Sequence, residues 1–341
     1  MICLLPRQVV PPAMRILRPA LVPCREPRAN NAMNRGGLTR GGRSRRIAPN
    51  PLEASCHMPT IARPDGATIY YEVHGSGYPL LLIAPGGVNS QVEIWSRSAF
   101  NPMKEFGDEF MVIGMDQRHA GRSPAPAVAW DYDQSVADQI AVLDALGLQR
   151  AHVMGGCIGC AHAWRLAHDA PDRVSGIIAQ DPVGLDETNS LGTFFRMFDE
   201  TMRIARSEGT EGVVAAAMAN PMFILANGGG PFAQRIHDDE AFRQEILAMP
   251  REVYIALIVR YRDGLWPDNI PYFNVPEEWM ATCPTPMLVL PGSDAFHPTG
   301  IAHRMCREMP NCTCLDVDCR SAEKLPATLA AIRAFMHEHA T

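Results

Sequence analysis

Short strand-like segments alternate with segments of helical periodicity along most of this chain, and this alternation limits the folds that it can adopt. Between two such strands, Val136, Ile140 and Leu143 recur at helical spacing before a stop at Gly147. Strands that alternate with helices form a mostly parallel sheet with helices on both faces. The sequence therefore predicts an α/β fold. The segments interpreted as strands include 67–74, 80–84, 110–115, 174–179 and 286–290.

The alternation stops for about a hundred residues in the second half of the chain. This stretch is rich in methionine, looks helical in pieces and is interrupted by three glycines at 228–230. We therefore predict a helical cap inserted over 183–280. The predicted core then consists of 58–182 and 281–341.

Residues 1–57 differ from the rest in composition. They hold ten arginines, no lysine, eight prolines and only two acids, without sustained apolar periodicity. Such a segment buries too little apolar surface to offset chain entropy, so we predict that it is disordered. Three interpretations stay open: an organelle transit peptide, a basic tail that binds a polyanion, or a start assigned upstream of a true start at Met58.

The net charge of the chain outside residues 1–57 argues against nucleic acid as a partner. The whole chain carries a formal charge of -6 and residues 1–57 carry +8, so the remainder carries -14. An acidic body lacks the basic face that phosphate binding needs, which argues against nucleic acid. We also find no apolar run that predicts a membrane span. We therefore predict a cytoplasmic protein with a small-molecule substrate, and a homo-oligomer is compatible with this sequence.

The pattern Gly-Gly-Cys-Ile-Gly at 155–159 lies between a predicted strand and a predicted helix. Small residues flank the central position because a nucleophile on such a sharp turn leaves no room for larger ones. The positive end of the helix dipole favours a reactive thiolate there. Cys157 is therefore the candidate nucleophile. The alternative is a buried cysteine in a glycine-rich turn.

Four further features of the sequence occur in order: a strand followed by Pro-Gly-Gly-Val at 81–88, Asp-Gln-Arg-His-Ala-Gly-Arg-Ser at 116–123, the Gly-Gly-Cys-Ile-Gly turn at 155–159, and a strand with Gly-x-Asp and Pro at 286–298. Together they resemble the oxyanion loop, the Asp-x-Arg-Gly-x-Gly-x-Ser loop, the nucleophile turn and the triad-acid loop of the α/β-hydrolase superfamily, over about 60–336. The resemblance implies an eight-stranded, mostly parallel sheet with an inserted cap. It assigns the triad acid to Asp294 and the oxyanion donors to the backbone N–H groups of Gly87 and Ile158.

The sequence departs from this family at two places. The oxyanion loop usually reads His-Gly, and here it reads Pro85-Gly86. The family's general base is a histidine after the last strand, but the corresponding loop at 316–321 has none. No histidine occurs between His303 and His337. The usual base is therefore missing.

His297 is the predicted replacement. It lies three residues after Asp294, on a loop expected at the edge of the sheet where Cys157 is presented. We predict that it serves as the base for Cys157, with either Asp294 or Asp181 orienting its ring. The alternative is an ordinary loop histidine.

The cysteines are expected to be reduced thiols. Ten of them are scattered through a mid-sized chain with no secretion signal, which is typical of a cytosolic protein. Cys157 and Cys160 form a Cys-x-x-Cys pattern, but at a strand-to-helix turn Cys160 is expected to be a small packing residue. We predict neither a metal nor another cofactor. Four cysteines near the C-terminus fit no zinc pattern: Cys306, Cys312, Cys314 and Cys319.

These features predict a hydrolase that cleaves an ester, thioester or lactone of a small molecule through an acyl intermediate on Cys157. The superfamily includes dienelactone hydrolases, which use a cysteine nucleophile on this fold. One fold hosts many functions, so two alternatives stay open. They are a non-catalytic ligand-binding protein that has lost the usual base and a thiol redox protein.

Deletion of residues 1–57 is expected to leave thermal stability and solubility unchanged, because the segment is predicted to contribute nothing to the core. Thermal unfolding of the full and the shortened chain measures this. A clear fall in melting temperature on truncation would contradict the prediction.

Overall fold

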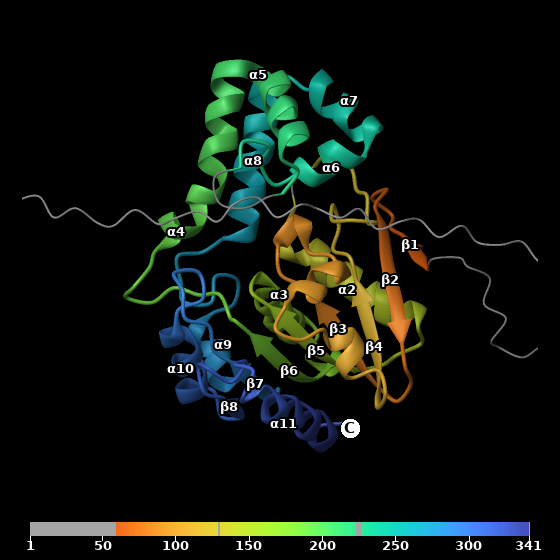
Figure 1. Ribbon diagram of the computed structural model, residues 1–341, viewed down its shortest axis with the longest axis vertical. Coiled ribbons are helices and arrows are strands. Elements are labelled where there is room, and N and C mark those ends of the chain that lie inside the picture. Colours follow the sequence, from red (N-terminus) through yellow and green to blue (C-terminus); the bar gives the residue numbers. More distant parts are fainter. Residues whose placement is uncertain (1–58, 129, 223–226, 341) are drawn as a thin grey trace, which may run out of the picture. The chain divides into compact units, whose positions relative to one another are not determined.

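An eight-stranded sheet forms the centre of the computed structural model, which describes residues 59–128, 130–222 and 227–340 (Figure 1). The predicted disordered segment lies outside these residues. The strand order is β1-β2-β4-β3-β5-β6-β7-β8. The pairs β1–β2 and β2–β4 are antiparallel, and every other neighbouring pair is parallel. The predicted α/β fold is therefore confirmed. The strands are β1 Thr60–Ala62, β2 Thr68–His74, β3 Tyr78–Ile83, β4 Phe110–Met115, β5 Ala151–Gly156, β6 Val174–Gln180, β7 Met287–Leu290 and β8 Cys312–Cys314.

Helices cover both faces of the sheet. Successive side chains of a strand point to opposite faces, so Leu81 of β3 packs in one core with Trp164 of α3, and Leu82 packs in the other with Met336 of α11. Burial on both faces explains why β3 is apolar throughout. The helices are α1 Pro102–Glu105, α2 Tyr132–Ala145, α3 Ile158–Asp169, α4 Leu191–Phe195, α5 Asp199–Ala219, α6 Ala233–Asp238, α7 Glu240–Ala248, α8 Arg251–Leu265, α9 Glu277–Thr282, α10 Thr299–Glu308 and α11 Leu325–Glu338.

Local sequence sets the ends of α2. The Asp131 side chain accepts a hydrogen bond of 3.0 Å from the backbone N–H of Gln134, which satisfies one of the unpaired donors of the first turn. Gly147 follows the helix with a φ of 67°, and the N–H of Leu148 bonds back to the carbonyl of Leu143. The stop predicted at Gly147 is thus the observed one.

Helices α4 to α9, here called the inserted helices, lie between β6 and β7. Within this group α5 packs on α6, α7 and α8 (Figure 1). Their shared core is aromatic and aliphatic, and includes Phe198, Phe232, Phe242 and Tyr261. No helix among the described residues is both long enough and apolar enough to cross a bilayer.

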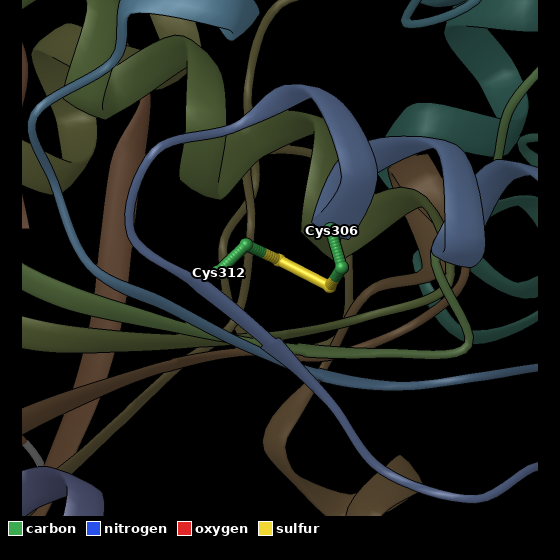
Figure 2. Close-up of a disulfide and its surroundings, with 2 residues drawn as sticks. All are labelled: Cys306 and Cys312. Carbon is green, nitrogen blue, oxygen red and sulfur yellow. A yellow bond between two sulfur atoms is a disulfide. The ribbon is translucent and has the colours of Figure 1, made fainter.

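One disulfide corrects the expectation that all cysteines are reduced. Cys306 of α10 and Cys312 of β8 are bonded, with their Cα atoms 4.8 Å apart (Figure 2). The expectation rested on the absence of a disulfide framework, and sequence spacing carries no signal for a single bridge. The turn between α10 and β8 brings the two residues within the usual Cα range of a disulfide. The free cysteines among the described residues are Cys157, Cys160, Cys283, Cys314 and Cys319.

Candidate functional site

Cys157 occupies the sharp turn between β5 and α3. Its φ of 54° and ψ of -122° lie in a region that non-glycine residues rarely adopt, at a cost on the order of 1–3 kcal/mol. The backbone N–H of Cys157 donates to the carbonyl of Gln180 on β6 at 2.9 Å, which holds the turn in place. The side chain is half-buried and stands at the N-terminus of α3.

Close packing of this turn requires the glycines on either side. A Cβ atom on Gly159 would lie 2.2 Å from the carbonyl oxygen of Ile83, and one on Gly155 would lie 2.3 Å from the carbonyl oxygen of Gly159. Neither contact is possible without moving backbone. The Gly-x-Cys-x-Gly spacing is therefore the local requirement for a strand and a helix to approach this closely.

His297 and Asp294 meet on the loop that follows β7. The Nδ1 atom of His297 lies 2.9 Å from both carboxylate oxygens of Asp294. The backbone N–H groups of Phe296 and His297 also donate to Oδ1 of Asp294, at 2.8 and 3.0 Å. The carboxylate thus organises its own loop as well as the imidazole. The Nε2 atom of His297 is buried and makes no hydrogen bond of its own within the described part of the chain.

The charge environment of His297 favours its protonated form. Burial alone would lower the pKa of His297, but the Cys157 thiolate, followed by the Asp294 carboxylate, outweighs burial and raises the pKa to about 10. His297 and Cys157 are therefore close enough to act on each other. Because Nδ1 faces Asp294, Nε2 is the nitrogen left for the sulfur.

Asp181 has a different partner. Both of its carboxylate oxygens bind the guanidinium of Arg320, which also donates from Nη2 to the carbonyl of Pro291 at 2.9 Å. Arg320 comes from the loop at 316–321, where the family's histidine is expected. Of the two aspartates predicted as alternatives for orienting His297, the structure brings Asp294 to the ring and pairs Asp181 with Arg320.

The two predicted oxyanion donors line one cavity with Cys157 and His297. This cavity has a volume of about 300 Å³. Ile158 is the first residue of α3 and Gly87 the first of a short 3₁₀ turn, so neither N–H is used inside its helix. We call residues 85–88 the oxyanion loop. Apart from Cys157 and His297 the side chains around the cavity are apolar: Val183, Phe194, Met197, Leu265, Trp266 and Phe296, beside Gly86, Gly87 and Ile158.

Sequence reasoning missed most of this lining. Phe194, Leu265 and Trp266 come from the inserted helices or directly follow them, where no motif marks a position as facing the site. The sequence marked Arg320 only weakly, because this residue lies in the loop where the family has its histidine. No sequence pattern marked Tyr261 of α8, whose hydroxyl contacts the oxyanion loop.

Cys160 is placed as a packing residue. Its side chain is fully buried, and its sulfur donates to the carbonyls of Gly155 at 3.2 Å and Gln180 at 3.3 Å. Burial and the nearby charge of Cys157 raise the pKa of Cys160, which disfavours its thiolate. Among the residues that the structure describes, no three His, Cys, Asp or Glu side chains are grouped so that they could hold a metal ion.

The chain has the α/β-hydrolase fold. Residues 79–221 match the family described as alpha/beta hydrolase fold. A thermophilic esterase from Thermogutta terrifontis has the same fold, with a TM-score of 0.52, 22% identity, and coverage of 83% of this chain and 97% of the esterase. The sheet topology and these matches show the fold that the sequence motifs predicted.

Two relatives show how far sequence likeness extends. The chain is 30% identical over 158 residues to an Azorhizobium caulinodans protein that carries the name carbamate hydrolase RutD. That match covers 46% of this chain and 55% of the relative, so it spans only about half of the relative's length. A second relative, rhodomycin D methylesterase DauP of Streptomyces sp., is 29% identical over 213 residues, covering 56% of this chain and 69% of the enzyme.

Titration of the His297 ring is expected to give a pKa of about 10, far above the ordinary 6.5. NMR of labelled histidines measures it, with the buried His162, whose pKa burial lowers to about 3, as an internal control. Asp294→Asn is expected to lower the His297 value clearly, and Asp181→Asn to change it less, because Asp181 faces Arg320.

The raised pKa of His297 determines how its contribution to the stability of the fold changes with pH. The stabilising contribution of the His297 pairing is complete below pH 6.5 and is lost as the pH rises through about 10. A wild-type value near 6.5, or equal effects of the two asparagine variants, would contradict this electrostatic assignment.

Proposed function

We propose that this protein is a hydrolase that cleaves an ester, thioester or lactone of a small molecule through an acyl intermediate on Cys157. The observation that carries the proposal is the meeting of Cys157, the Asp294-bound His297 and two oxyanion donors at one apolar cavity. The names of the relatives, a carbamate hydrolase and a methylesterase, agree with a hydrolase.

Acylation starts from the thiolate of Cys157 and protonated His297. The sulfur attacks the substrate carbonyl carbon, a C–S bond forms, and the π electron pair moves to the carbonyl oxygen. The backbone N–H groups of Gly87 and Ile158 stabilise this oxyanion. When the tetrahedral intermediate collapses, the bond to the leaving group breaks and His297 donates its proton to the leaving alkoxide or thiolate.

Deacylation reverses these roles. Neutral His297 takes a proton from water as the water oxygen attacks the thioester carbonyl. Collapse of the second tetrahedral intermediate releases the carboxylic acid and restores the Cys157 thiolate beside protonated His297. Asp294 stays ionised throughout and keeps Nδ1 of the ring directed away from the sulfur.

The cavity restricts the substrate. Its walls contain no charged side chain apart from the proposed catalytic pair. A charged group on the substrate would lose its hydration there without gaining a partner, which is costly. Its volume of about 300 Å³ is at the small end for ligand pockets. We therefore propose a small substrate that is uncharged next to its carbonyl.

Replacement of the nucleophile tests the proposal directly. Cys157→Ala is expected to abolish hydrolysis of short p-nitrophenyl esters and thioesters, measured by product release. Iodoacetamide is expected to label Cys157 well before the other thiols. Cys314 is the matched control, because it is also half-buried but burial raises its pKa.

An alternative outcome would favour a binding protein. If the wild type and Cys157→Ala are equally inert across the acyl substrates while a small ligand raises the melting temperature of both, the hydrolase proposal fails.

Replacement of the base is expected to lower turnover about 100-fold or more, within the usual contribution of general acid–base catalysis. In His297→Ala, nothing protonates the leaving group or activates water. Steady-state kinetics from pH 5 to 10 measures the loss. His303→Ala is the control, because this exposed histidine of α10 lies outside the cavity lining, and it is expected to keep wild-type turnover. Equal turnover in the two variants would remove His297 from the mechanism.

A further inference from the structure

We propose that Tyr261 of α8 is a positioning residue for the reaction: its hydroxyl fixes the oxyanion loop, so that the inserted helices set the geometry of the oxyanion hole. This inference rests on the proposed hydrolase function, because the oxyanion that these donors stabilise is the tetrahedral intermediate of that acyl transfer. It assigns a role to a residue 173 positions away from the loop that it holds.

A single buried hydrogen bond makes this connection. The backbone N–H of Val88 donates to the Tyr261 hydroxyl at 2.7 Å, and both residues are almost fully buried. Gly87 lies against the same oxygen, since a Cβ atom built on Gly87 would be 2.9 Å from it. The hydroxyl therefore contacts the loop at the residue next to the proposed donor and at the donor residue itself.

The oxyanion loop needs such an external support. Gly86 and Gly87 have φ values of 112° and 58°, in a region where glycine is favoured. Two consecutive glycines also leave the chain many other conformations of similar energy. Fixing the N–H of Val88 fixes the peptide plane on one side of Gly87, which limits the directions in which the N–H of Gly87 can point.

Tyr261 itself is held firmly. Its ring packs against Trp130 and Phe232, with ring centroids 5.6 and 5.8 Å away. One turn later on α8, Leu265 lines the cavity, and its carbonyl accepts a hydrogen bond of 3.1 Å from the Tyr132 hydroxyl. The same helix end therefore carries both a wall of the cavity and the hydroxyl that holds the oxyanion loop.

Loss of the hydroxyl is expected to displace the loop. Without it, the buried N–H of Val88 has lost its acceptor, and the loop must shift to find another. When a substitution far from the reacting atoms misplaces a catalytic group by about 1 Å, the rate can fall about 100-fold. Removing one oxyanion donor outright costs about 100- to 1000-fold in kcat. A partly displaced donor should cost less, so we expect a loss of about 10- to 100-fold.

The test compares Tyr261→Phe with Tyr254→Phe. Tyr254 is a matched control: it lies on the same helix, is fully buried, and its hydroxyl pairs with Thr201 at 3.2 Å, away from the cavity lining. On a p-nitrophenyl ester, Tyr261→Phe is expected to lower kcat about 10- to 100-fold with little change in KM. Tyr254→Phe is expected to leave kcat and KM near the wild-type values.

Two further measurements separate positioning from general damage. Alkylation of Cys157 by iodoacetamide forms no oxyanion, so its rate is expected to be unchanged in Tyr261→Phe. A small aldehyde inhibitor forms a hemithioacetal whose oxygen occupies the oxyanion hole, so its affinity is expected to fall with kcat. Thermal unfolding of both variants checks that they are folded to the same extent.

The outcomes are distinct. The inference is overturned if Tyr261→Phe hydrolyses the ester as fast as Tyr254→Phe, or if alkylation of Cys157 slows as much as hydrolysis does. A wild-type protein that hydrolyses none of the acyl substrates overturns the proposed function and this inference with it. Loss of kcat and aldehyde affinity with normal alkylation supports both.

Discussion

The turn at Cys157 is the constraint around which the rest of the site is arranged. A strand and a helix meet there so closely that Gly155 and Gly159 admit no side chain, and Cys157, midway between them, takes a positive φ. The hydrogen bond from Cys157 to Gln180 and the burial of α3 against the sheet hold this backbone in place. In return, the sulfur stands at the helix N-terminus beside the N–H of Ile158, where the dipole and the unpaired donor favour negative charge.

In the proposed mechanism, a histidine on the loop after β7 takes the place of the family's usual base. His297 and Asp294 lie three residues apart on one loop, so their mutual orientation does not depend on how two separate loops pack. The loop after β8, where the family has its histidine, carries Arg320 in this chain. Because Arg320 neutralises Asp181 and also binds the carbonyl of Pro291, it ties the ends of β6 and β7 together and leaves Asp294 as the carboxylate that faces the ring.

Whether a feature of the fold or the site was predictable depends on how far apart in the sequence its residues lie. Strand and helix alternation is a local pattern, and it was sufficient for the fold. The position of Cys157 and the pairing of His297 with Asp294 were also predictable, because each depends on residues only a few positions apart. The pairing of Asp181 was not, since its partner Arg320 is 139 residues away and either aspartate fitted the sequence. The Cys306–Cys312 bridge depends on a turn geometry that spacing alone does not reveal.

The inserted helices show why local patterns give the chemistry of a site more readily than its shape. Their sequence is that of an ordinary helical core, and Leu265 and Tyr261 satisfy the same apolar periodicity as their buried neighbours. Only the packed structure separates the two: Leu265 borders the cavity, and the Tyr261 hydroxyl reaches the N–H of Val88. Since both belong to the end of α8, an acyl group that displaces this helix would also move the hydroxyl. In the proposed mechanism, the fit of the substrate and the stabilisation of the oxyanion therefore depend on the same structural element.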